Sequence, residues 1–176
     1  SYYREDKMPQ LFIMNPQGFE QTRLSPGMAE SYASWTPDAN FLVYVLTTGD
    51  LNILQMRDRY SKYANFSKFD RTSDEGRLGA VMEPNVSLDG TMIVYTRFAD
   101  KNHNIYTAVF ADRGRTTTKL TDSNMDSAPF WSPDGKWILF TSERDGNKEI
   151  YIMDAQGGQV TNLTNLISVD FDPAWQ

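Results

Sequence analysis

The chain has 176 residues, of which 40% are hydrophobic and 13% aromatic, enough for one domain with a substantial core and too apolar for a disordered segment. Its net charge of −6 opposes long-range attraction to nucleic acid and to anionic membranes. The absence of cysteine excludes disulfides and thiolate metal sites. No apolar run approaches the length of about 18 residues that a membrane-spanning helix needs, so membrane insertion is not expected.

In chain order, the first segment that recurs is 11–15, Leu-Phe-Ile-Met-Asn, which matches the later segment 150–154, Ile-Tyr-Ile-Met-Asp. It belongs to a predicted partial first blade over residues 1–26. Three anchor segments follow, which read Trp35-Thr-Pro-Asp-Ala, Val86-Ser-Leu-Asp-Gly and Trp131-Ser-Pro-Asp-Gly. Residues 168–176 repeat the approach to the third anchor and are predicted to start a further blade.

The spacing of these copies is regular. An aromatic residue follows each of the three anchors nine positions later, at Tyr44, Tyr95 and Phe140. Successive anchors at positions 35, 86, 131 and 175 are separated by 51, 45 and 44 residues. A period of about 40–45 residues is typical of four-stranded β-propeller blades. The predicted fold class is therefore all-β, one β-propeller domain over residues 1–176 with about four antiparallel blades' worth of sequence.

The best-preserved copy shows the expected order of strands within a blade. Strand A ends at Trp131, and the Ser-Pro-Asp-Gly sequence after it predicts a tight turn. Residues 136–142 form the predicted strand B, in which apolar residues alternate with period two. Residues 149–154 form strand C, and residues 159–164 form the outer strand D.

This repeat resembles that of TolB-type WD-like β-propellers, and the resemblance covers nearly the whole chain. Its most specific part, Pro-x-Trp-Ser-Pro-Asp-Gly followed by Ile-Tyr-x-Met-Asp, is intact only over residues 129–154; Val86, Leu88 and Ala39 depart from it. The resemblance implies a non-catalytic scaffold that binds a protein or peptide in the periplasm or cell envelope. Similar repeats form the lid propellers of prolyl-oligopeptidase-like hydrolases. The alternative is therefore a lid or specificity domain whose catalytic domain lies outside this chain.

The number of blades in the ring stays open at this point. The chain fits a fragment of a longer propeller, an assembly in which copies complete each other's sheets, or a closed four-bladed ring. An open arc exposes unpaired strand edges, which favour self-association.

Catalytic motifs are absent from the sequence. No Gly-x-Ser-x-Gly nucleophile elbow and no phosphate-binding glycine loop occur, and one histidine without cysteine cannot build a zinc site. That histidine, His103, is predicted to lie in a solvated turn between strands B and C. The chain is accordingly predicted not to be an enzyme, and no cofactor is expected.

Calcium is the one metal that the sequence raises. Asp122, Asn124 and Asp126 alternate like the first half of an oxygen-ligand loop, although the usual glycine and closing glutamate are missing. Glu30 and Asp170 occupy the position of Asp126 in other copies. These acids are predicted on the D-to-A loops near the channel mouth. They fit either a cation or basic-peptide site, or acids that cap turns and strands.

A basic and aromatic stretch departs most from the repeat. It contains a second set of candidate binding residues, which comprises Arg57, Arg59, Tyr60, Lys62 and Tyr63. Such a mixture fits a protein-interface hot spot or, against the acidity of the chain, a nucleic acid contact. An ordinary strand D with a longer loop is the simpler interpretation.

The repeated tryptophans Trp35, Trp131 and Trp175 are predicted to fill the core between blades, because each holds the same place in its repeat.

Overall fold

The computed structural model describes residues 2–3, 8–24, 29–48, 51–58, 67–68, 80–99 and 101–175, and these residues contain β-strands and turns without any α-helix. Three sheets have four antiparallel strands each, and two smaller sheets have two strands each. The predicted all-β fold of four-stranded antiparallel sheets is thereby confirmed. None of the described residues belongs to a helix long and apolar enough to cross a membrane.

The strands follow one another in chain order within every sheet. The two small sheets pair β1 (Tyr2–Tyr3) with β2 (Pro9–Gln10), and β3 (Phe12–Ile13) with β4 (Thr22–Arg23). The second blade contains β5 (Ala29–Trp35), β6 (Phe41–Thr48), β7 (Leu51–Asp58) and β8 (Ser67–Lys68). The third contains β9 (Ala80–Val86), β10 (Met92–Ala99), β11 (Asn102–Val109) and β12 (Thr117–Lys119). The fourth contains β13 (Asp126–Trp131), β14 (Trp137–Ser142), β15 (Glu149–Asp154) and β16 (Thr161–Asn162).

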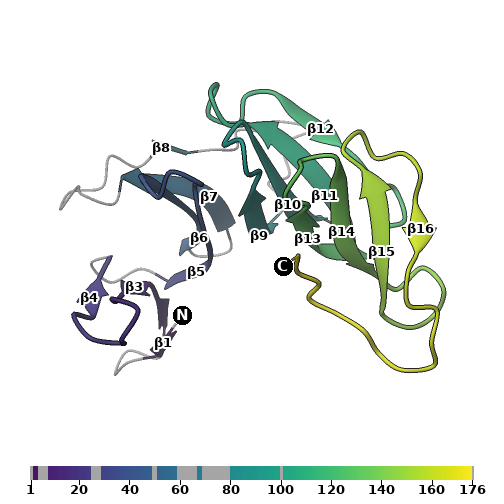
Figure 1. Ribbon diagram of the computed structural model, residues 1–176, viewed down its shortest axis with the longest axis horizontal. Coiled ribbons are helices and arrows are strands. Elements are labelled where there is room, and N and C mark those ends of the chain that lie inside the picture. Colours follow the sequence, from purple (N-terminus) through teal and green to yellow (C-terminus); the bar gives the residue numbers. More distant parts are fainter. Residues whose placement is uncertain are drawn as a thin grey trace.

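The sheets stand side by side in an arc, with the inner strands β5, β9 and β13 toward its centre and the outer strands β8, β12 and β16 toward its rim (Figure 1). The last segment runs back from the rim to the centre beside the fourth blade (Figure 1). There, the backbone N–H of Asp170 donates to the carbonyl of Lys148 at 2.8 Å, and that of Asp172 donates to the Thr141 hydroxyl at 3.2 Å. The inner side of the arc is therefore formed by β5, β9 and β13, one strand from each four-stranded blade (Figure 1).

The core lies between the sheets. One cluster joins Val43 and Val45 of the second blade to Ile93 and Tyr95 of the third. A second cluster joins the third blade to the fourth; its members include Val94, Ile105, Trp131, Phe140 and Tyr151. Alternate residues of a strand point to opposite faces, so each middle strand fills both interfaces and the blades stabilise one another by apolar burial.

The turn between strands A and B has the same structure in all three four-stranded blades. A hydroxyl donates to the aspartate two residues later; the pairs are Thr36–Asp38, Ser87–Asp89 and Ser132–Asp134, each at 2.6 Å. The same hydroxyl accepts the N–H of the residue that opens strand B, at 2.9–3.0 Å. These bonds explain why Ser/Thr-x-Asp recurs even where Pro37 becomes Leu88 and Gly90 becomes Ala39.

These three aspartates couple stability to pH. The hydroxyl hydrogen bond, followed by a backbone N–H bond, lowers the pKa of each carboxyl below its ordinary value. A lowered folded-state pKa contributes stability that is present above the unfolded pKa of about 3.9 and is lost as the pH falls through the folded-state pKa. We expect the triple variant Asp38→Asn, Asp89→Asn, Asp134→Asn to lose less stability than the parent on acidification. Urea midpoints measured across the acid limb check this, and parallel curves would contradict it.

A β-bulge interrupts each inner strand. The register shifts between Ser31 and Ser34 in β5, with corresponding shifts in β9 and β13. A non-glycine residue with positive φ sits three positions before each anchor; these are Tyr32 (51°), Glu83 (55°), Ala128 (50°) and Asp172 (54°). The last segment is not assigned to a strand, but its Asp172 has the same positive φ as the inner strands have at this position.

Side chains tie neighbouring inner strands together. The Glu83 carboxylate accepts the N–H of Ala128 at 2.7 Å, and the Asn85 amide oxygen accepts that of Trp131 at 2.9 Å. The Ser34 hydroxyl accepts the N–H of Val86 at 3.3 Å. Inner-strand edges that would otherwise be unpaired are therefore linked blade to blade.

Two sequence-based expectations are wrong. His103 lies in strand β11, paired with Phe98, and not in a turn. Its ring centroid is 4.8 Å from that of Phe98, and the chain reverses earlier, at Lys101, where φ is 69°. Trp35 is 44% exposed and does not fill a core. The sheets beside it have strands of only two residues, whereas Trp131 packs against a four-stranded blade and is 6% exposed, as predicted.

Candidate functional site

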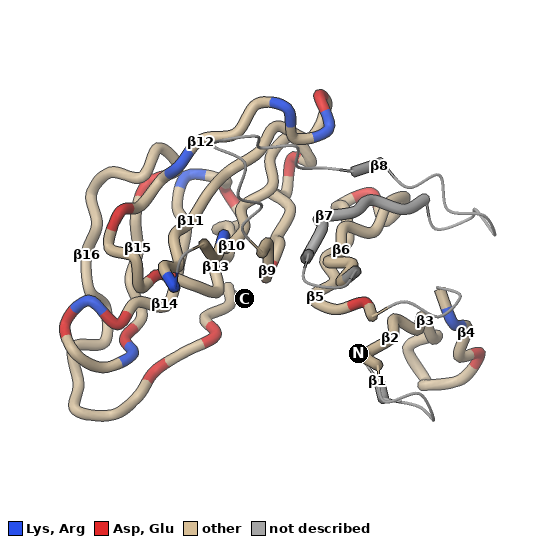
Figure 2. The backbone as a smooth tube through the Cα atoms, turned by 180° about the vertical axis from the view of Figure 1, so that it is seen from behind, with Lys and Arg blue, Asp and Glu red and all other residues tan. Residues whose placement is uncertain are grey.

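The inner strands present two mouths to a partner. Strands β5, β9 and β13 begin at the D-to-A mouth, where the loops from the preceding outer strands arrive, and end at the A-to-B mouth, where the Ser/Thr-x-Asp turns lie. Most Lys, Arg, Asp and Glu positions lie in loops and at strand ends (Figure 2). The charged groups that a partner meets at either mouth therefore come mainly from these loops and strand ends.

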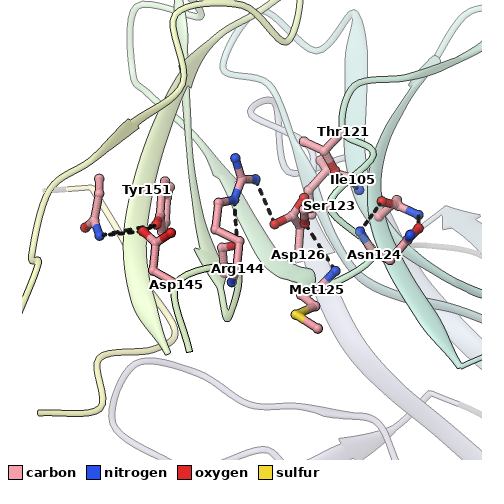
Figure 3. Close-up of polar contacts among 12 residues, drawn as sticks. Ile105, Thr121, Ser123, Asn124, Met125, Asp126, Arg144, Asp145 and Tyr151 are labelled. Carbon is pink, nitrogen blue, oxygen red and sulfur yellow. Dashed lines mark hydrogen bonds and ion pairs between the residues drawn. The ribbon is translucent and has the colours of Figure 1, made fainter. Parts of the chain in front are cut away.

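A buried carboxylate and a partly exposed arginine form an ion pair at the D-to-A mouth of the fourth blade. Asp126 is fully buried, and its Oδ1 accepts a hydrogen bond from Nη2 of Arg144 at 2.9 Å (Figure 3). The guanidinium also lies over the ring of Tyr151, 4.8 Å from its centroid, and 5.5 Å from the centroid of Phe140. Arg144 is thus held by a charge and by two aromatic faces.

Tyr151 continues this cluster toward the rim. Its hydroxyl donates to Asp145 and accepts a hydrogen bond from the Asn162 amide at 3.2 Å. Burial, together with the hydrogen bond to Asp145, raises the pKa of Tyr151 to about 12. The phenol is therefore protonated at neutral pH and is a structural donor rather than a proton carrier.

Amide contacts fix the D-to-A loop of the third blade. Asn104 and Asn124 bond reciprocally: the Asn104 amide donates to Asn124 Oδ1, and the Asn124 backbone N–H donates to Asn104 Oδ1, both at 3.0 Å (Figure 3). The Thr121 hydroxyl accepts the backbone N–H of Ile105 at 3.0 Å. The side chain of Asn124 is therefore occupied by another amide.

The predicted acids are dispersed among separate partners. Asp122 is exposed and pairs with Lys119, whereas Asp126 pairs with Arg144. Glu30 is buried at the start of β5, and Asp170 is partly buried in the last segment. Within the described ranges, no three His, Cys, Asp or Glu side chains are grouped so as to hold a metal ion. A calcium or basic-peptide site at these acids stays a prediction.

The second predicted set falls largely outside the described residues. Arg57 lies in β7, where its backbone pairs with Leu42. Arg59, Tyr60, Lys62 and Tyr63 lie outside the described ranges.

The A-to-B mouth contains an apolar hollow of about 220 Å³. Its lining comes from three neighbouring inner strands, their turns and the last segment, and includes Trp35, Pro37, Leu88, Trp131, Pro133 and Trp175. Two of these side chains are well exposed, Leu88 at 61% and Trp35 at 44%. An apolar hollow rimmed by polar turns can take up an apolar side chain of a partner.

The sequence does not predict this hollow, because only the contrast between neighbouring sheets separates the exposed Trp35 from the buried Trp131. Arg97 is also not singled out from the sequence; it is a side chain of β10 that is only 8% exposed and lies opposite Val81 of β9. A signal for it is present in the repeat. Val81 stands five residues before its anchor, where the other copies carry Glu30, Asp126 and Asp170.

Comparison with known proteins identifies the repeat. The model of the TolB beta propeller domain family (PD40) matches residues 74–176, more than half of the chain. The Tol-Pal system protein TolB of Ruthia magnifica is 30% identical over 84 residues, 48% of this chain and 20% of TolB. The uncharacterized peptidase YuxL of Bacillus subtilis is 28% identical over 102 residues, 54% of this chain and 16% of YuxL.

A solved structure extends the match to nearly the whole chain. The crystal structure of TolB from Acinetobacter baumannii superposes with a TM-score of 0.77 and 25% identity, covering 94% of this chain and 40% of that one. The chain therefore spans well under two thirds of each of these relatives. The predicted resemblance to TolB-type propellers is confirmed.

Proposed function

Because this chain belongs to the TolB β-propeller domain family, we propose that it is a non-catalytic scaffold that binds a protein or peptide partner at the A-to-B mouth. The apolar hollow between Trp35, Leu88 and Trp131 carries this proposal. Exposed aromatic and aliphatic side chains around a preformed hollow are typical of protein-binding surfaces. The inner strands are tied to one another by hydrogen bonds, so the hollow is held rigidly before the partner arrives.

The chemistry of the lining defines the partner. The lining is mainly apolar, and its polar members are Ser34, Asn85 and Ser132. It therefore suits an apolar or aromatic side chain on an extended segment, whose backbone bonds to the polar groups at the rim. By similarity to TolB, the setting is the periplasm or cell envelope and the partner an envelope protein.

A peptide selection tests this function. Peptides selected from a random library on the purified protein are expected to carry an apolar anchor and to bind with micromolar affinity, on the order of −8 kcal/mol. Leu88→Asp places a charge in the hollow at an exposed turn position and is expected to weaken binding at least about tenfold, a change of about 1.4 kcal/mol.

The matched control is Leu163→Asp. Leu163 is similarly exposed, at 52%, but follows the outer strand β16. Binding should be unchanged in this variant. Equal losses in both variants, or hydrolysis of the selected peptides by the protein itself, would contradict the proposal.

A second candidate is favoured by the similarity to YuxL, which is named as a peptidase. In that case, the chain is the propeller portion of a hydrolase, and the same mouth admits or selects peptide substrates. One observation distinguishes the two functions. Only the lid function requires a catalytic domain in the same polypeptide.

A further inference from the structure

Arg97 is a buried cation at the other mouth of the inner strands. It lies near the end of β10, directly opposite Val81 of β9, and is only 8% exposed. Ile93 and Tyr95 precede it at alternate positions and pack against the second blade, so Arg97 faces that blade too. Its guanidinium lies over Tyr106, 5.4 Å from the ring centroid.

The fourth blade shows what such a guanidinium requires. Arg144 also lies over the strand-C tyrosine of its own blade, and there the buried carboxylate of Asp126 neutralises it. In the third blade, the position of Asp126 is occupied by Val81. Among the residues that the structure describes, no carboxylate lies within ion-pair distance of Arg97, and no hydrogen bond joins its guanidinium to another group.

A buried guanidinium that no described carboxylate neutralises can still bind an anion strongly. Removing a charge from water is costly unless an opposite charge compensates it. Arg97 keeps 8% of its surface in contact with solvent, and a small group from outside would meet the side chain there. The cation–π contact with Tyr106 restrains the guanidinium on one side and uses none of its N–H donors.

We propose that Arg97 is the anchor of a carboxylate-binding site between the second and third blades, which accepts a side-chain or C-terminal carboxylate of a partner. A planar monoanion matches the two parallel donors and the single charge of one guanidinium. A phosphate dianion would keep charge that this one base cannot neutralise. The site lies at the D-to-A mouth and does not depend on the function proposed for the A-to-B mouth.

Arginine-selective NMR of the whole protein tests the site with acetate as the probe. Sodium acetate replaces sodium chloride at constant ionic strength, so that screening stays the same. The Nε–Hε signal of Arg97 is expected to move along a saturable curve, whereas that of Arg144, which already has Asp126, should stay in place. Equal or linear responses of both signals would overturn the proposal. A stronger response to inorganic phosphate would overturn the carboxylate assignment.

Three variants test whether acetate binds at Arg97. Arg97→Gln removes the Nε–Hε signal of Arg97, which assigns that signal, and should abolish the acetate-induced shift. Val81→Asp places a carboxylate directly opposite Arg97 on the paired strand, within reach of the guanidinium. We expect this variant to lose the acetate response because the internal carboxylate occupies the site, while the uncharged Val81→Asn control keeps it. If the acetate-induced shift of the Arg97 signal persists in folded Val81→Asp protein, acetate binds elsewhere and the proposal is wrong.

Discussion

Replacing Trp131 with alanine is expected to lower the free energy of unfolding by about 3–5 kcal/mol, since a buried indole is lost and a cavity remains. Trp131 is 6% exposed and packs on Val94 and Ile105 of the preceding blade as well as on its own sheet. The loss therefore falls on the interface between two blades. Urea denaturation of the parent and variant proteins measures it.

Trp35→Ala is the matched control, because Trp35 holds the same place in its repeat. With 44% of its surface exposed, it has much less burial to lose, and a cost of about 1 kcal/mol or less is expected. Similar losses in the two variants would mean that the repeat position, and not the neighbouring sheet, determines burial.

Arg144→Met is expected to be the second severe change, at about 3–5 kcal/mol, because it leaves the carboxylate of Asp126 buried without its cation. Methionine keeps part of the apolar length of the side chain but removes the guanidinium from Asp126 and from the rings of Phe140 and Tyr151, so the loss reports the ion pair together with these cation–π contacts. Chemical denaturation at neutral pH gives the value.

The double variant Asp126→Ala, Arg144→Met separates charge from packing. It is expected to be more stable than Arg144→Met alone, since the uncompensated carboxylate is gone. Arg97→Met is a second control, with a guanidinium over a tyrosine but no buried carboxylate, and it should cost less than Arg144→Met. A double variant less stable than Arg144→Met would contradict this description of the pair.

The blade architecture could be predicted because it depends on local and periodic features. Trp131 and the turn at Asp134 mark the end of one strand and the start of the next, and the predicted strand C at residues 149–154 is confirmed as β15. The sequence predicts the outer strand of this blade over residues 159–164, whereas β16 spans only Thr161–Asn162. One side of an outer strand has no neighbour within its blade, so apolar periodicity says little about where its pairing ends.

The candidate sites were harder to predict because they depend on which blades meet. The exposure of Trp35 follows from the small sheets beside it, and no feature of its own repeat indicates this. The pairing of Asp126 with Arg144 brings together residues 18 positions apart, one at the start of β13 and one in the turn after β14. The unusual Arg97 becomes visible only when Val81 is compared with the acids of the other copies.

Amide hydrogen exchange of the protein with and without a selected peptide tests the central claim, that the A-to-B mouth is where a partner binds. Binding at the A-to-B mouth is expected to slow exchange in the turns at residues 36–41, 87–92 and 132–137 and to leave the rates in the D-to-A loop at residues 120–125 unchanged. Protection confined to the D-to-A loop, with the three turns unaffected, would contradict it.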